Sequence, residues 1–160
     1  MNSQQQFLAI KEVAFFASNP IAQDLKSKLL ALGGTTVVWR EEPHLSVLVE
    51  QGHVFDLESK MTDGAAGQCH ANVARLFMLE DDIKIATGYA LSDDGLWRQH
   101  SWGIKDETIL ETTVKREKYF GIIWSKMTIT EFVFAQLGDE LMRKPYFDLL
   151  GRLPMPEKQG

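Results

Sequence analysis

Helical spacing of apolar residues dominates the first part of the chain, with five such positions from Phe7 to Ala17. Positions three and four apart lie on one face of a helix, so the pattern predicts an amphipathic helix over 7–18. Asn19-Pro20 interrupts it, and a second helix is expected over 21–32, ending at Gly33-Gly34. The apolar positions of the two helices are Phe7, Ile10, Val13, Ala14 and Ala17, then Ile21, Leu25, Leu29 and Leu32.

Later segments have the β-branched and aromatic residues and the turn residues typical of strands. A loop over 58–68 leads into a helix that opens at Cys69. Thr128 or Thr130 can cap a last helix that runs through Leu137, with Thr128-x-x-Glu131 as a capping box. This order of elements predicts an α+β fold, in which the Cys69 helix packs on an antiparallel sheet. The expected strands cover 35–40, 45–50, 84–91, 96–104, 108–114 and 119–124.

Composition narrows the class of protein. The chain has 160 residues, of which 44% are hydrophobic and 24% charged, and its net charge is −5. We expect one globular domain over 1–152 and a flexible tail over 153–160. Without a Lys/Arg stripe, the charge pattern disfavours a nucleic-acid partner. The N-terminal residues lack the pattern of a signal peptide, and no apolar run is long enough for a membrane span, so a cytoplasmic location is expected.

The single cysteine, Cys69, is the first candidate for chemistry. One cysteine forms no internal disulfide, which is compatible with a reducing compartment. A helix N-terminus presents unpaired N–H groups and the positive end of the helix dipole, and both favour the thiolate, the nucleophilic form of cysteine. A single cysteine is also often a small buried apolar residue, so its role depends on its neighbours.

His100 and Glu111 are the candidate partners, because each lies in an expected strand of one hairpin. A two-residue turn at Lys105-Asp106 would set His100 directly opposite Glu111, and directly opposed residues share one face of the sheet. The carboxylate would then fix the tautomer of the imidazole, as a nucleophile–base–orienter triad requires.

These residues resemble a known family. Gly67-Gln68-Cys69, His100-Ser101-Trp102 and Leu110-Glu111-Thr112-Thr113 are similar to the nucleophile, histidine and carboxylate segments of the transglutaminase-like branch of the papain-like cysteine protease superfamily. The resemblance covers roughly residues 60 to 125. The chain differs from that pattern in having Glu111 in place of aspartate and Thr112 in place of proline.

The resemblance implies a papain-like, transglutaminase-like core and a cysteine hydrolase or acyltransferase. Cys69 would be the nucleophile, His100 the general base and acid, and Glu111 the orienting carboxylate. The substrate would be a peptide, a protein or a small amide or ester, and the chemistry requires no cofactor and no metal. Backbone N–H groups near Cys69 would form part of an oxyanion hole. The supporting side chains expected beside it are Gln68, which donates to the oxyanion, Asn72 on the same helix face as Cys69, and Trp102, which shields the imidazole.

Two other interpretations remain open. The first is that the chain is a non-catalytic intracellular domain that keeps this fold and binds a partner. A zinc site would use Cys69, His70 or His100, and Glu111, although the sequence has no closely spaced Cys or His pair. His70 follows Cys69 directly and is expected to point about 100° away from it on the helix, as a surface or packing residue.

Overall fold

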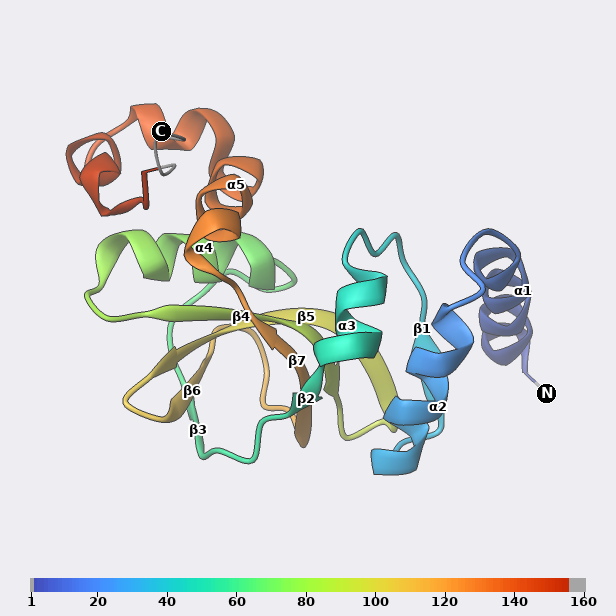
Figure 1. Cartoon of the computed structure of the whole chain (residues 1–160). Helices are drawn as coiled ribbons and strands as arrows, with labels where there is room; N and C mark the ends of the chain where they lie inside the picture. The colour runs from blue at the N-terminus through green and yellow to red at the C-terminus, as the bar shows by residue number, and fades with distance from the viewer. Residues whose placement is uncertain (1, 156–160) are drawn as a thin grey trace. The chain divides into compact units, whose positions relative to one another are not determined.

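The structure, a computed structural model, describes residues 2–155 and has a mixed α+β fold with a mostly antiparallel sheet (Figure 1). Its helices are α1 (Ser3–Ser18), α2 (Ala22–Leu32), α3 (Leu45–Gln51), α4 (Cys69–Leu79) and α5 (Lys126–Leu137), followed by the 3₁₀ turns η1 (Gly138–Met142) and η2 (Phe147–Arg152). Its strands are β1 (Thr36–Val38), β2 (His53–Val54), β3 (Ser59–Met61), β4 (Lys84–Leu91), β5 (Leu96–Lys105), β6 (Thr108–Glu111) and β7 (Lys118–Ile123). Across the described residues, the sheet has the strand order β2-β7-β4-β5-β6-β3, and β1 pairs with β5.

The described residues form two compact units. The first comprises 2–56, 88–100 and 116–122, and the second comprises 57–87, 101–115 and 123–155. Strands β4, β5 and β7 contribute residues to both units, whereas α4 and α5 lie in the second.

The first unit begins with the expected pair of helices. Helix α1 begins four residues before the expected start, because Asn2 and Gln5 form a reciprocal capping box with bonds of 2.8 and 2.9 Å. Helix α2 buries Leu25 and Leu29, and it ends at Gly33, whose φ of 136° suits glycine. Both segments are helical as their apolar spacing predicts, but α1, unlike α2, has no fully buried residue.

The expected strand over 45–50 is wrong, since this segment is helix α3. Its β-branched residues favour a strand locally. The buried positions, however, are Leu45 and Leu48, which are three apart and therefore lie on one helical face, and α3 packs against α2. Tertiary packing decides the conformation here.

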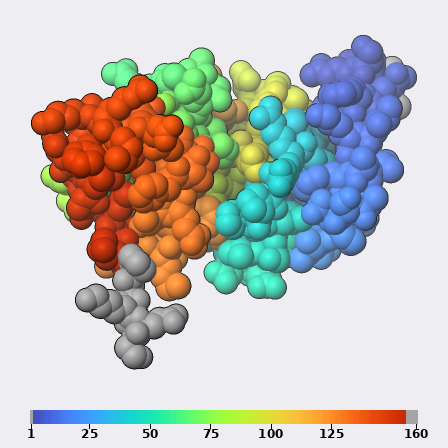
Figure 2. Space-filling model, turned by 90° about the horizontal axis from the view of Figure 1, so that it is seen from above, coloured from blue at the N-terminus to red at the C-terminus, as the bar shows by residue number. Residues whose placement is uncertain are grey.

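The second unit has its core between α4, α5 and the residues that follow α5. Figures 1 and 2 show α4, in green, beside the orange and red C-terminal segment. Leu153 is buried in this core, and the carbonyl of Pro154 accepts a bond of 2.9 Å from Thr130. Positions 153 and 154 of the expected tail are thus packed, and 156–160 lie outside the described residues. The buried members of the cluster are Val73, Ala74, Met78, Ile85, Ile129, Val133, Leu137, Leu141 and Leu153.

Two further expectations about this unit need correction. Strand β3 lies within the expected loop over 58–68 and pairs in parallel with β6, and its three exposed side chains give no alternation to detect. Helix α5 begins at Lys126 with Ser125 as its N-cap, so Thr128 lies inside the helix and donates back to the Ser125 carbonyl at 3.1 Å. The capping box at Thr128 is therefore wrong.

None of the helices in the described range is both long enough and apolar enough to span a membrane.

Candidate functional site

Cys69 is the first residue of α4, as the sequence predicts, and its side chain is half-buried and reduced. Gln68 occupies the N-cap position and is exposed, and within the described residues its side chain makes no capping bond. The first helical turn closes through Asn72 N–H, which donates to the Gln68 carbonyl at 2.8 Å. The thiol therefore lies where the N–H groups and dipole of a helix act on it.

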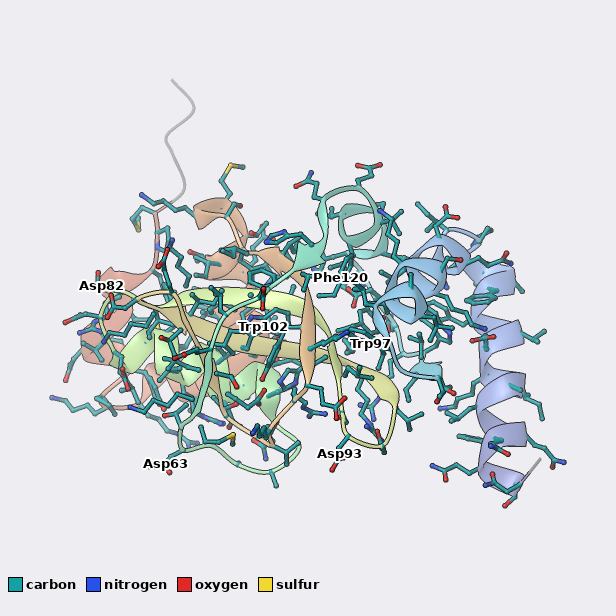
Figure 3. All side chains as sticks on the ribbon, turned by 90° about the horizontal axis from the view of Figure 1, so that it is seen from below. Asp63, Asp82, Asp93, Trp97, Trp102 and Phe120 are labelled. Carbon is teal, nitrogen blue, oxygen red and sulfur yellow. The ribbon has the colours of Figure 1, made fainter. Side chains whose placement is uncertain are left out.

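The loop before Cys69 is exposed from Asp63 to Gln68, but it is held at two points (Figure 3 labels Asp63 at its outer edge). Thr62 N–H donates to the Glu111 carbonyl at 2.8 Å. The side chain of Asn72 forms hydrogen bonds with both backbone groups of Ala65. Its Oδ1 accepts from Ala65 N–H at 3.1 Å, and its Nδ2 donates to the Ala65 carbonyl at 2.8 Å.

Gly64 is required at this close approach. A Cβ there would lie 2.5 Å from the Thr112 carbonyl oxygen and 2.6 Å from Nδ2 of Asn72. Asn72 itself is almost completely buried, so its role is to fix this loop from beneath. The sequence places Asn72 correctly on the Cys69 face of the helix but does not reveal its partner.

His70 has a specific interior role that the sequence did not indicate. Its Nδ1 lies 2.6 Å from the Oγ of Ser101, which is fully buried on β5, and Ser101 donates in turn to the Thr87 hydroxyl at 3.0 Å. Because Ser101 gives its only proton to Thr87, Nδ1 of His70 acts as the donor to Ser101. This chain anchors the start of α4 to β5, immediately after His100. No sequence signal links residues 31 positions apart.

His100 lies on β5 in the first unit and is 1% exposed. Its ring centroid is 6.3 Å from that of Tyr119 on β7, with an interplanar angle of 35°. A buried imidazole beside an aromatic ring is shielded from bulk water, which strengthens its electrostatic interactions.

Glu111, the last residue of β6, is fully buried. Its Oε1 accepts hydrogen bonds from the backbone N–H and the hydroxyl of Thr113, both at 3.0 Å. A buried carboxylate is stable only when hydrogen-bonded or paired. The local sequence thus supplies two donors two residues beyond it.

The expected pairing of His100 directly opposite Glu111 is wrong. The turn consists of Asp106 and Glu107, with φ of 49° and 58°, one residue later than expected. Two successive positive φ values are typical of the type I′ hairpin turn, whose twist matches that of the strands. The β5–β6 register pairs Gly103 with Leu110, and one further step sets Trp102 opposite Glu111. Asp-Glu is a poor sequence signal for this turn, because aspartate is a usual first residue of a type I′ turn but glycine, not glutamate, normally follows it.

Trp102 is completely buried on β5 in the second unit, and Figure 3 shows it among the side chains of the sheet. Cys69, Gln68, Asn72, Trp102 and Glu111 thus belong to one compact unit, and His100 belongs to the other.

The described residues contain no cluster of side chains that fits the zinc interpretation. Among residues 2–155, no group of three His, Cys, Asp or Glu side chains is arranged to hold a metal ion.

Comparison of the chain with protein-family models, with curated proteins and with solved structures returned no match.

Proposed function

We propose that this protein is a cysteine hydrolase or acyltransferase with a papain-like, transglutaminase-like core, in which Cys69, His100 and Glu111 form the catalytic triad. The observation that carries the proposal is the position of Cys69. Cys69 is a half-buried residue at the first position of α4, directly after an exposed loop that buried Asn72 holds in place.

The two partner residues support the proposal through their burial. His100 and Glu111 are ionisable groups inside the protein. Burial of such groups costs free energy unless they are hydrogen-bonded or paired, and buried ionisable groups are therefore candidates for a functional site. The residue opposite Glu111 in the continued register is Trp102, which lies two positions after His100 on the same strand. Side chains two positions apart on a strand alternate back to one face, so the proposed sharing of a face by His100 and Glu111 does not depend on the one-residue change in the turn.

The chemistry is acyl transfer. In the resting enzyme the proton of the thiol resides on the His100 imidazole. The thiolate of Cys69 attacks the carbonyl carbon of an amide or ester, a C–S bond forms, and the carbonyl electrons move onto oxygen. Collapse of this intermediate breaks the bond to the leaving group, which takes its proton from His100. The product of this step is a thioester on Cys69.

Release of the acyl group restores the thiolate. Water or an amine attacks the thioester carbonyl while His100 accepts the proton of the attacking group, and the C–S bond breaks. The backbone N–H of Cys69 and the exposed side-chain amide of Gln68 would stabilise the oxyanion in both steps. Asn72 positions the loop and is not assigned to the oxyanion hole, because Ala65 occupies both ends of its amide.

The proposal predicts a covalent acyl adduct. We expect 4-nitrophenyl acetate, an activated ester, to add one acetyl group to the protein, with the label on the peptide that contains Cys69. Intact-mass and peptide mass spectrometry after acid quenching measure the adduct. The matched control is Cys69→Ser, which should carry no rapid label. Equal labelling of both proteins would show that the reaction does not use this thiol.

A non-catalytic interaction domain is the alternative, and one observation favours it. Helix α1 exposes Phe7, Ile10 and Val13 at 56, 70 and 72%, and three apolar side chains on one helix face are typical of a docking surface. The acetylation experiment separates the two functions, because a docking domain has no need of a reactive Cys69.

A further inference from the structure

A continuous chain of hydrogen bonds connects the C-terminal segment to the loop before Cys69. It starts at Glu140 on η1, whose carboxylate accepts two hydrogen bonds from Arg75 on α4. Nε of Arg75 donates to Oε2 at 2.8 Å and Nη2 donates to Oε1 at 3.0 Å. This bidentate geometry is the strongest arrangement for an arginine–carboxylate pair, and it fixes the plane of the guanidinium.

The remaining nitrogen of Arg75 faces Asn72. Nη1 of Arg75 donates to Oδ1 of Asn72 at 3.4 Å, and the same oxygen accepts from Ala65 N–H. A guanidinium has only hydrogen-bond donors, so it can bond to the oxygen of the Asn72 amide but not to its NH₂ group, which is also a donor. Arg75 therefore favours the one orientation of Asn72 that satisfies both backbone groups of Ala65.

Glu140 is adjacent in sequence to a residue of the hydrophobic core. Its neighbour in η1, Leu141, is 1% exposed and packs in the core cluster together with Val73 and Met78 of α4. Electrostatics support the contact: the hydrogen bond from Arg75 lowers the pKa of the Glu140 carboxyl, and the bond to Glu140 raises the pKa of Arg75. The other charged or titratable groups that act on Glu140 are Arg143 and Tyr146.

We infer that Arg75 and Glu140 are positioning residues for the nucleophile, and that the C-terminal segment sets the geometry of the loop before Cys69 through Asn72. This inference rests on the proposed function for its catalytic consequence, and on the hydrogen bonds described above alone for its structural one. Arg75 and Glu140 are 65 residues apart in the sequence, so their contact forms only when η1 packs beside α4. In this inference the reactivity of Cys69 therefore depends on the position of η1.

The test uses the full chain and two readouts. Amide hydrogen exchange at Ala65, followed by NMR, reports the loop without any catalysis, and the rate of acetylation at Cys69 reports the nucleophile. We expect Glu140→Gln and Arg75→Lys each to speed Ala65 exchange about tenfold and to slow acetylation by up to about 10²-fold. The matched control is Asp81→Asn, which removes another ion pair of the same unit, Arg152–Asp81 at 3.0 Å.

A charge swap separates positioning from simple stabilisation. The double variant Arg75→Glu with Glu140→Arg retains an ion pair but turns a carboxylate toward Oδ1 of Asn72. We expect it to unfold at a temperature close to the wild type and still to exchange Ala65 rapidly. Wild-type exchange at Ala65 in the swap, or in both single variants, overturns the inference. If no variant or wild-type protein is acetylated while exchange changes as stated, the proposed function fails and the positioning contact stands.

Discussion

Replacing His100 with glutamine is expected to slow acetylation of Cys69 by about 10² to 10⁴-fold, the range that a general acid–base residue contributes. In the proposed mechanism His100 holds the thiol proton in the resting state and later gives it to the leaving group. Glutamine keeps a polar side chain in this buried position but accepts no proton at neutral pH. The measurement is the time course of the adduct with 4-nitrophenyl acetate.

The control for this substitution is His53→Gln. His53 is an exposed residue of β2, and its ring packs against Phe55 with centroids 4.4 Å apart. Cys69 of the His53→Gln variant should be acetylated at the wild-type rate. Thermal unfolding of both variants shows whether each remains folded at the temperature of the assay. A folded His100→Gln protein that acetylates as fast as the wild type would remove His100 from the mechanism.

Replacing Gly88 with alanine is expected to destabilise the protein by at least about 3 kcal/mol, which is at the upper end for overpacking. Gly88 lies in β4 with φ of 157°, and a Cβ there would be 2.1 Å from the carbonyl oxygen of Phe120 and 2.6 Å from the Cα of Gly121. Both neighbours are backbone atoms of β7, so no side-chain rotation relieves the contact. The strand that carries Tyr119, the ring beside His100, must move.

Gly151→Ala is the matched control for this effect. Gly151 lies in η2 outside the positive-φ region, and a Cβ there would meet no atom within 4 Å. Its substitution should change the free energy of unfolding by no more than about 0.5 kcal/mol. Urea unfolding of the two variants and the wild type gives the comparison. Equal stability of Gly88→Ala and Gly151→Ala would contradict the close approach of β4 and β7.

Local sequence patterns predict the secondary structure correctly where the conformation depends on residues nearby in the sequence. Strand β4 has the expected bounds, and β5 follows after the expected turn at Ser92–Gly95, because turn residues separate two runs of strand formers. The start of α4 at Cys69 is also confirmed, since two glycines precede the helical pattern. These elements carry Cys69, the proposed nucleophile, and His100.

The remaining features depend on contacts that no local pattern records. Helix α3 has strand-forming residues and is helical because Leu45 and Leu48 are buried on one of its faces. The hairpin turn falls at Asp106-Glu107, where Glu107 is an unusual residue for positive φ. The contacts of Asn72 with Ala65 and of His70 with Ser101 require the folded chain, so the sequence predicts a candidate nucleophile but not these two contacts near it.

The central claim is that Cys69 is a thiolate activated in the folded protein, and alkylation by iodoacetamide as a function of pH tests it most directly. We expect the alkylation rate of native Cys69 to rise with pH with a midpoint well below ~8.5, the pKa of a free cysteine. In His100→Gln the midpoint should rise toward that value. Labelling of Cys69 only after the protein is unfolded, or a native midpoint at or above ~8.5 that His100→Gln leaves unchanged, would contradict the account.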